Sequence, residues 1–153
     1  MNYLIGVGNY SMYDDSIGLR IVEYIAENGL DKGFEVIDLS ANLINLLYYF
    51  DRQTTQIIIV DTAKMGLPAG EYLFFSPQQV SSSKRVAGLS THEGDLLSIL
   101  RLAEELDYPI PELKLMGIEP LLIKNEFGLS AVLQESIPLY SSRLINEFNC
   151  LPV

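Results

Sequence analysis

One tetrapeptide limits the fold of this chain more than any other feature: Ile57-Ile58-Ile59-Val60 is entirely β-branched and apolar. Successive side chains of a strand point to opposite faces of its sheet, so a strand with this sequence must be covered on both sides. Such strands are typical of the centre of a mostly parallel sheet that carries helices on each face. The tetrapeptide therefore predicts a three-layer α/β sandwich.

The rest of the chain alternates between short apolar runs and segments of helical period, which fits that prediction. The runs predict strands at 3–7, 34–39, 72–75 and 113–118, and the periodic segments predict helices at 15–29, 41–50, 92–106 and 130–148. Ser81-Ser82-Ser83-Lys84-Arg85 predicts a loop, and Pro138 predicts a kink or a late start in the last helix. Without a linker or repeat, residues 1–153 are expected to form one α/β domain.

Composition excludes several classes of function. Twenty acidic and ten basic residues give a formal net charge of −10, which argues against a nucleic-acid partner or an anionic membrane. One histidine and one cysteine exclude a disulfide framework, a Cys-rich zinc site and a multi-histidine metal cage. No apolar run approaches the ~18 residues of a membrane span. Without an export signal or membrane segment, we expect a cytoplasmic monomer.

Acidic residues follow several of the predicted strands, at the sheet edge where open α/β folds bind ligands. Asp14 and Asp15 follow the first strand, Asp38 lies at the end of the second, and Asp61 directly ends the strand at 57–60. Asp14 or Asp15 could instead be a helix N-cap, and Asp61 could belong to a turn. Their convergence at one edge favours a functional site.

The single histidine, His92, is predicted to lie in the first turn of a helix. The sequence Ser90-Thr91-His92-Glu93 has the capping-box pattern, and the helix dipole at that position favours a neutral imidazole. A surface or structural role is the alternative for a lone histidine. Together with two carboxylates such as Asp15 and Asp61, however, it forms an O,O,N donor set suited to a borderline divalent metal.

Other catalytic motifs are incomplete. Gly6-Val7-Gly8 follows a predicted strand, but Ser11 occupies the third glycine position of the dinucleotide fingerprint. No Gly-x-Ser-x-Gly elbow surrounds a serine, which argues against a serine hydrolase. Cys150 is predicted to be a peripheral packing residue.

Taken in order, the motifs resemble those of the NiFe-hydrogenase maturation proteases, endopeptidases that trim the C-terminus of a hydrogenase large subunit. The resemblance rests on Leu4-Ile5-Gly6-Val7-Gly8-Asn9, Tyr13-Asp14-Asp15-Ser16-Ile17-Gly18, Ile58-Ile59-Val60-Asp61-Thr62-Ala63, Pro68-Ala69-Gly70, Ser90-Thr91-His92-Glu93, Gly117-Ile118-Glu119-Pro120 and Gly128-Leu129-Ser130. It spans nearly the whole chain in order and spacing.

The resemblance implies that Asp15, Asp61 and His92 contact metal and take part in catalysis, and that Asp38 binds substrate. It implies that nickel is presented by the substrate, the large-subunit precursor, and that no cofactor is resident. The extension is then cut only after nickel insertion. Two departures from the family pattern are Ser16, where glycine is frequent, and Leu39-Ser40, where glycines usually follow the second-strand Asp.

Two alternatives remain at this point. A non-catalytic checkpoint protein would bind the nickel-loaded precursor through the same three residues without cutting it. A small-substrate hydrolase would instead hold its own metal.

Overall fold

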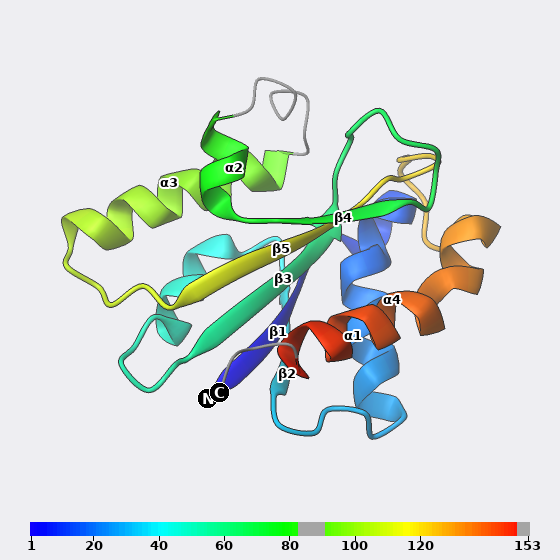
Figure 1. Cartoon of the computed structure of the whole chain (residues 1–153). Coiled ribbons are helices and arrows are strands. Elements are labelled where there is room, and N and C mark those ends of the chain that lie inside the picture. Colours follow the sequence, from blue (N-terminus) through cyan, green and yellow to red (C-terminus); the bar gives the residue numbers. More distant parts are fainter. Residues whose placement is uncertain (83–90, 150–153) are drawn as a thin grey trace.

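The computed structural model describes residues 1–82 and 91–149, apart from the side chains of 80–82, 91–95 and 149. A five-stranded sheet with the order β2-β1-β3-β5-β4 runs through the molecule (Figure 1). The strands are β1 (Asn2–Val7), β2 (Glu35–Ser40), β3 (Gln56–Thr62), β4 (Tyr72–Phe75) and β5 (Glu112–Ile118). All pairings are parallel except that of β4 with β5. The expected mostly parallel sheet is confirmed.

Helices cover both faces of this sheet. They are η1 (Tyr10–Ser16), α1 (Ile17–Glu27), η2 (Leu43–Tyr49), α2 (Pro77–Ser82), α3 (Thr91–Glu105) and α4 (Ala131–Asn149), where η marks a 3₁₀ helix. Figure 1 shows α1 and α4 side by side on one face, with α2 and α3 on the other. None of the helices in the described ranges is long and apolar enough to cross a membrane.

The central strand β3 divides its side chains between two cores, as the apolar tetrapeptide predicts. Ile58 and Val60 pack with α1 and α4, whereas Ile57 and Ile59 pack with η2 and α3. All seven residues of β3 are buried. Two cores that share one sheet make the three-layer sandwich.

Several predictions about local structure need correction. Residues 43–49 form a 3₁₀ helix and not an α-helix, and its buried side chains include Leu43 and Leu46, which lie three residues apart. Ile44, which follows Leu43 directly, is 53% exposed. Side chains at i and i+3 coincide in a 3₁₀ helix, so a spacing of three directs both leucines to the sheet. The first α-helix begins at Ile17, after η1 and later than expected. Because α4 begins at Ala131 and contains Pro138, the alternative of a late start is wrong for this helix.

A further correction concerns the predicted loop at 81–85, because α2 extends over its first two residues. Ser76 and Gln79 form a capping box: Gln79 Oε1 accepts from the Ser76 N–H at 2.7 Å, and Ser76 Oγ accepts from the Gln79 N–H at 3.4 Å. Pro77 occupies the first helical position, where its missing N–H has no cost. Residues 83–85 lie outside the described part.

Candidate functional site

The site lies at the carboxyl edge of the sheet. Strands β1, β3 and β5 run parallel, so the residues that follow them reach the same edge. Asp61 is the penultimate residue of β3, and Asp15 belongs to η1, which begins shortly after β1 ends. Both residues are buried, with 6% of their surface exposed. The predicted convergence of these two acids is therefore observed.

Thr62 joins the two carboxylates. Its hydroxyl donates to Asp15 Oδ1 at 2.8 Å and lies 3.5 Å from Asp61 Oδ1, while its backbone N–H donates to that same Asp61 oxygen at 2.7 Å. The Thr62 side chain is almost fully buried. One residue thus fixes the orientation of both acids, and the sequence interpretation gave it no role.

Asp14 does not join this pair, although it precedes Asp15. Its fully buried carboxylate accepts four hydrogen bonds from the segment after β5: from the N–H groups of Leu121, Leu122 and Ser130, and from the Ser130 hydroxyl, at 2.8–3.1 Å. It caps no helix by its side chain, so the N-cap alternative is wrong for Asp14. It anchors η1 to the loop at 121–130.

Asp38 lies on the other face of the sheet from Asp61. Asp38 pairs in register with Gly6 of β1, and Gly6 pairs with Val60 of β3. The Asp38 side chain therefore leaves the sheet on the same face as that of Val60, which packs toward α1. Asp61 is one residue beyond Val60, so it points to the α3 face. The exposed Asp38 carboxylate accepts from the N–H and hydroxyl of Ser40 at 2.9 and 2.8 Å. The Asp38 side chain therefore leaves the sheet on the face opposite to that of Asp61.

His92 is the second residue of α3, but its side chain lies outside the described part, as do Ser90 and the side chain of Glu93. The 15 residues of α3 span about 22 Å, close to the length of the seven-residue strand β5. Because α3 leads back to the amino end of β5, its first turn lies toward the carboxyl edge. Among described side chains, no group of three potential metal ligands occurs.

Glu119 is a further buried acid at this edge. One of its carboxylate oxygens accepts from the N–H groups of Met65 and Leu67 at 2.7 and 3.0 Å, which ties the loop after β3 to the end of β5. The rule that selected Asp61 as an acid closing a parallel strand also selects Glu119. No comparable signal identifies Thr62, apart from its place next to Asp61.

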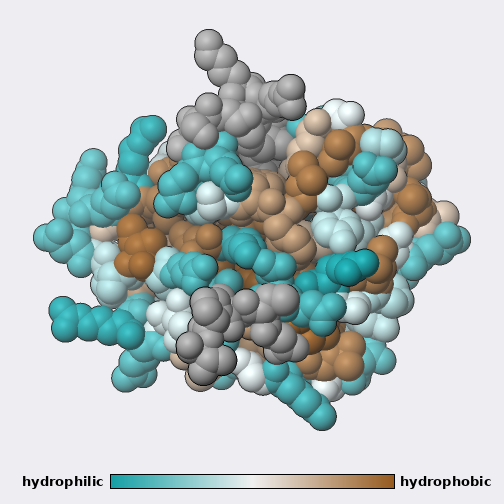
Figure 2. Space-filling model, viewed as in Figure 1, coloured by the Kyte–Doolittle hydropathy of each residue, from teal (hydrophilic) through white to brown (hydrophobic). Residues whose placement is uncertain are grey.

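Exposed apolar side chains border the site. Leu121, Leu122 and Phe127 are 62%, 47% and 71% exposed, and they lie on the loop that Asp14 anchors. Figure 2 shows hydrophobic surface at the upper right, where Figure 1 places the segment after β5 and the start of α4. Tyr13 holds the same loop through its N–H, which donates to the Glu126 carbonyl at 2.8 Å. Exposed apolar groups on an anchored loop are typical of a surface that contacts another macromolecule.

Comparison with protein families gives a match that covers most of the chain. The family model described as hydrogenase maturation protease matches residues 19–147. Among curated relatives, the hydrogenase 3 maturation protease of Escherichia coli K12 is 23% identical over 141 residues, covering 92% of this chain and 86% of that protein. The hydrogenase expression/formation protein HupD of Rhodobacter capsulatus is 21% identical over 126 residues, and the match spans 60% of its length.

Solved structures share the fold over nearly the whole chain. The hydrogenase maturating endopeptidase HybD from E. coli superimposes with a TM-score of 0.77 at 21% identity, covering 97% of this chain and 93% of that one. The NiFe-hydrogenase maturation protease HybD from Thermococcus kodakarensis gives a TM-score of 0.76 at 22% identity, covering 96% of this chain and 99% of that one.

Proposed function

Because this chain belongs to the hydrogenase maturation protease family, we propose that it is an endopeptidase that removes the C-terminal extension of a NiFe-hydrogenase large-subunit precursor after nickel insertion. The observation that carries the proposal is the pair of nearly buried carboxylates, Asp15 and Asp61, joined by Thr62 at the ligand-binding edge of the sheet. Two acids held in this way form an oxygen pair suited to a divalent cation.

In this proposal Asp15, Asp61 and His92 recognise nickel that the precursor presents, and they place the scissile peptide bond beside it. Carboxylate oxygens and an imidazole nitrogen suit a borderline metal held partly by ligands of another protein. The metal polarises the scissile carbonyl or positions it, and a carboxylate acts as base toward water. No resident cofactor is required, because the metal arrives with the substrate.

A protein substrate is supported by the surface around the site. The exposed residues Leu121 and Phe127 stand on a loop held by the buried Asp14. The charged residues on that loop, Lys124 and Glu126, pair with each other at 2.8 Å. The rim therefore offers a largely apolar contact surface on a chain that otherwise carries a net charge of −10.

Asp61→Asn and His92→Ala test the proposal in a cleavage assay. Each removes one ligand from the set, so we expect cleavage of the nickel-loaded precursor to fall at least about 100-fold, with the nickel-free precursor uncut by every form. The measurement is the rate at which the precursor shortens, followed by mass spectrometry.

Asp31→Asn, an exposed aspartate near the opposite edge of the sheet, is the control and is expected to cleave at the wild-type rate. Undiminished cleavage by Asp61→Asn would remove the site assignment. Binding of the loaded precursor by the wild-type protein without any cleavage would instead support a checkpoint role.

A further inference from the structure

Among the described residues, the amino end of β5 has no strand partner on the side of β4. Backbone groups of β5 alternate between its two neighbours: the Glu112 N–H donates to Thr55 before β3, whereas the Glu119 N–H donates to Glu71 before β4. Odd-numbered residues of β5 therefore direct their N–H and C=O groups toward β4. The pairing with β4 ends at Phe75–Leu115, so the next outward-facing residue, Leu113, lies beyond the end of β4.

The chain after β4 does not replace the missing partner. In a longer antiparallel ladder Leu113 would pair with Pro77, two residues past Phe75. Pro77 has no N–H to donate, and the capping box of Ser76 and Gln79 turns the chain into α2 at this point. The strand edge of β5 is thus interrupted by a helix start.

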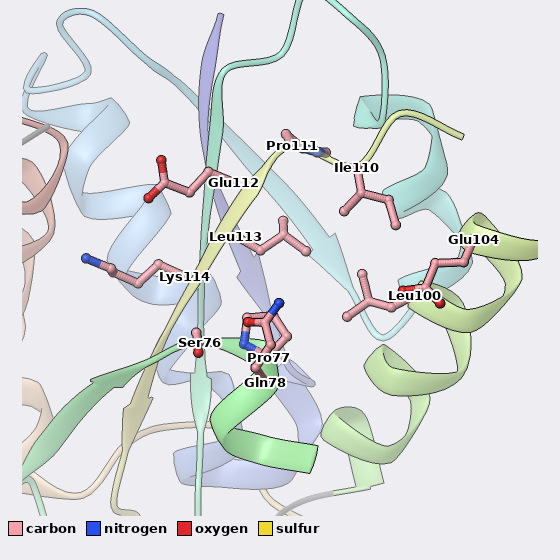
Figure 3. A pocket seen from close by; sticks show the side chains of 10 residues that line it. All are labelled: Ser76, Pro77, Gln78, Leu100, Glu104, Ile110, Pro111, Glu112, Leu113 and Lys114. Atoms are coloured by element: carbon pink, nitrogen blue, oxygen red, sulfur yellow. The ribbon is translucent and has the colours of Figure 1, made fainter. Parts of the chain in front are cut away.

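A groove lies at this position (Figure 3). Its volume is about 360 Å³, and its lining includes the apolar side chains of Pro77, Leu100, Ile110, Pro111 and Leu113. Glu104 of α3 also lines it. The side chains of Glu112 and Lys114 leave β5 on the opposite face from Leu113 (Figure 3). An adjoining hollow of about 250 Å³ shares Pro77, Leu100 and Glu104 with the groove and continues along α3 to Leu97.

We propose that this groove binds an extended peptide segment, which adds to β5 as a short strand at Leu113 and inserts an apolar side chain between Leu100 and Ile110. Main-chain hydrogen bonds from an open strand edge together with an apolar pocket for alternate side chains are the two parts of strand-addition recognition. The carboxylate of Glu104 favours a basic side chain in the neighbouring position of the peptide.

The occupant, which rests on the proposed function, is the C-terminal extension of the precursor. Asp61 is level with Gly117 of β5, and Leu113 lies four residues before Gly117, a distance of about 13 Å along the strand. Four extended residues cover that distance. The adjoining hollow extends from the groove along α3 as far as Leu97, five residues after His92, which is the direction of the site edge.

A binding assay with matched variants tests the groove without any cleavage. A fluorescent synthetic peptide with the sequence of the extension is titrated with the wild-type chain, Ile110→Asp and Tyr108→Asp. Ile110 and Tyr108 are equally exposed, at 38%, and only Ile110 lines the groove. We expect Ile110→Asp to weaken binding about tenfold or more, and Tyr108→Asp to stay within about twofold of wild type. Equal affinities for the two variants, or no binding by the wild type, would overturn the proposal.

Single N-methylation along the peptide tests for strand pairing. A paired strand directs every second N–H to its neighbour, so affinity is expected to fall at alternate positions and to persist at those between them. Uniform loss along the peptide, or none, would rule out strand addition at Leu113.

Cleavage of a precursor with a shortened extension separates this proposal from the proposed function. We expect a three-residue extension to raise KM several-fold and to make the Ile110→Asp variant behave like wild type. If neither precursor is cut, the proposed function fails while the peptide titration still decides the groove. If both are cut with the same KM, the groove proposal fails and the endopeptidase assignment stands.

Discussion

Thr62 holds the candidate site together at the scale of single residues. Its hydroxyl has one hydrogen, which lies in the short contact to Asp15 at 2.8 Å, while Asp61 receives the Thr62 backbone N–H at 2.7 Å. Thr62 therefore holds Asp15 through its hydroxyl and Asp61 mainly through its backbone N–H. Orientation by such supporting groups is what keeps metal-contacting carboxylates in a productive geometry.

Thr62→Val and Thr62→Ser test this positioning role. Valine keeps the shape and the backbone N–H but loses the hydroxyl, so we expect kcat on nickel-loaded precursor to fall about 10- to 100-fold with little change in KM. Serine restores the donor and is expected to recover most of the rate. Steady-state cleavage kinetics measure both.

Thr54→Val is the matched control, because Thr54 also lies next to β3, at the opposite end, and contacts Asp51 through its hydroxyl at 3.3 Å. We expect it to leave kcat unchanged. A Thr62→Ser variant as slow as Thr62→Val would mean that the threonine methyl group, and not the hydroxyl, is what the site needs.

At the same scale, the sequence predicts which residues lie at the site better than it predicts which groups they contact. Asp15 and Asp61 could be placed at one sheet edge because strand ends in a parallel sheet coincide. The face of the sheet was not predictable for Asp38, because it depends on the register of β2 against β1. Nor was the role of Asp14, whose carboxylate bonds to residues more than 100 positions later in the chain.

Among the elements, the first turn of α1 lies unusually close to the sheet. A Cβ atom on Gly18 would lie 2.3 Å from the Val60 carbonyl oxygen and 2.7 Å from that of Val7. A Cβ on Gly6 would lie 2.6 Å from the Gly18 carbonyl oxygen. These glycines let helix and strand backbones touch, which brings η1 and Asp15 within reach of Thr62. The Gly6-Val7-Gly8 motif thus serves packing at the site.

Gly18→Ala is expected to destabilise the chain by about 2–3 kcal/mol, because the added methyl group collides with two backbone carbonyls. Gly29→Ala is the control: Gly29 has φ +64°, and a Cβ there meets no atom within 4 Å. An alanine at position 29 is strained only by its backbone conformation, so we expect Gly29→Ala to lower the free energy of unfolding by about 1–2 kcal/mol. Urea denaturation measures both, and a Gly18→Ala variant no less stable than Gly29→Ala would contradict the close-contact argument.

The elements that the sequence predicts well are those with strong periodicity. All five strands and the helices around 17–27, 91–105 and 131–149 lie close to their predicted positions. The errors, η2 and α2, occur in short segments whose form depends on what they pack against. A seven-residue segment between two strands has too few hydrogen bonds to fix its own helix type.

For the whole molecule, the shared sheet couples the two cores. Each face of β3 contributes side chains to one of the two cores. Loss of packing on one face therefore destabilises a strand on which the other core also depends. Contacts between β3 and β5 and between β1 and β3 extend over the length of these strands. A single cooperative unit is the expected consequence.

Leu144→Ala and Leu46→Ala test this coupling, because each removes a fully buried side chain from a different core. We expect both to lower the free energy of unfolding by about 2–5 kcal/mol, and Tyr48→Ala, at a residue 81% exposed, to change it by less than about 0.5 kcal/mol. Amide hydrogen exchange followed separately in α1 and α3 should show the same loss of protection for either core variant, since both helices lie on one cooperative sheet. Loss of protection confined to α3 in Leu46→Ala would instead show that the two layers unfold independently.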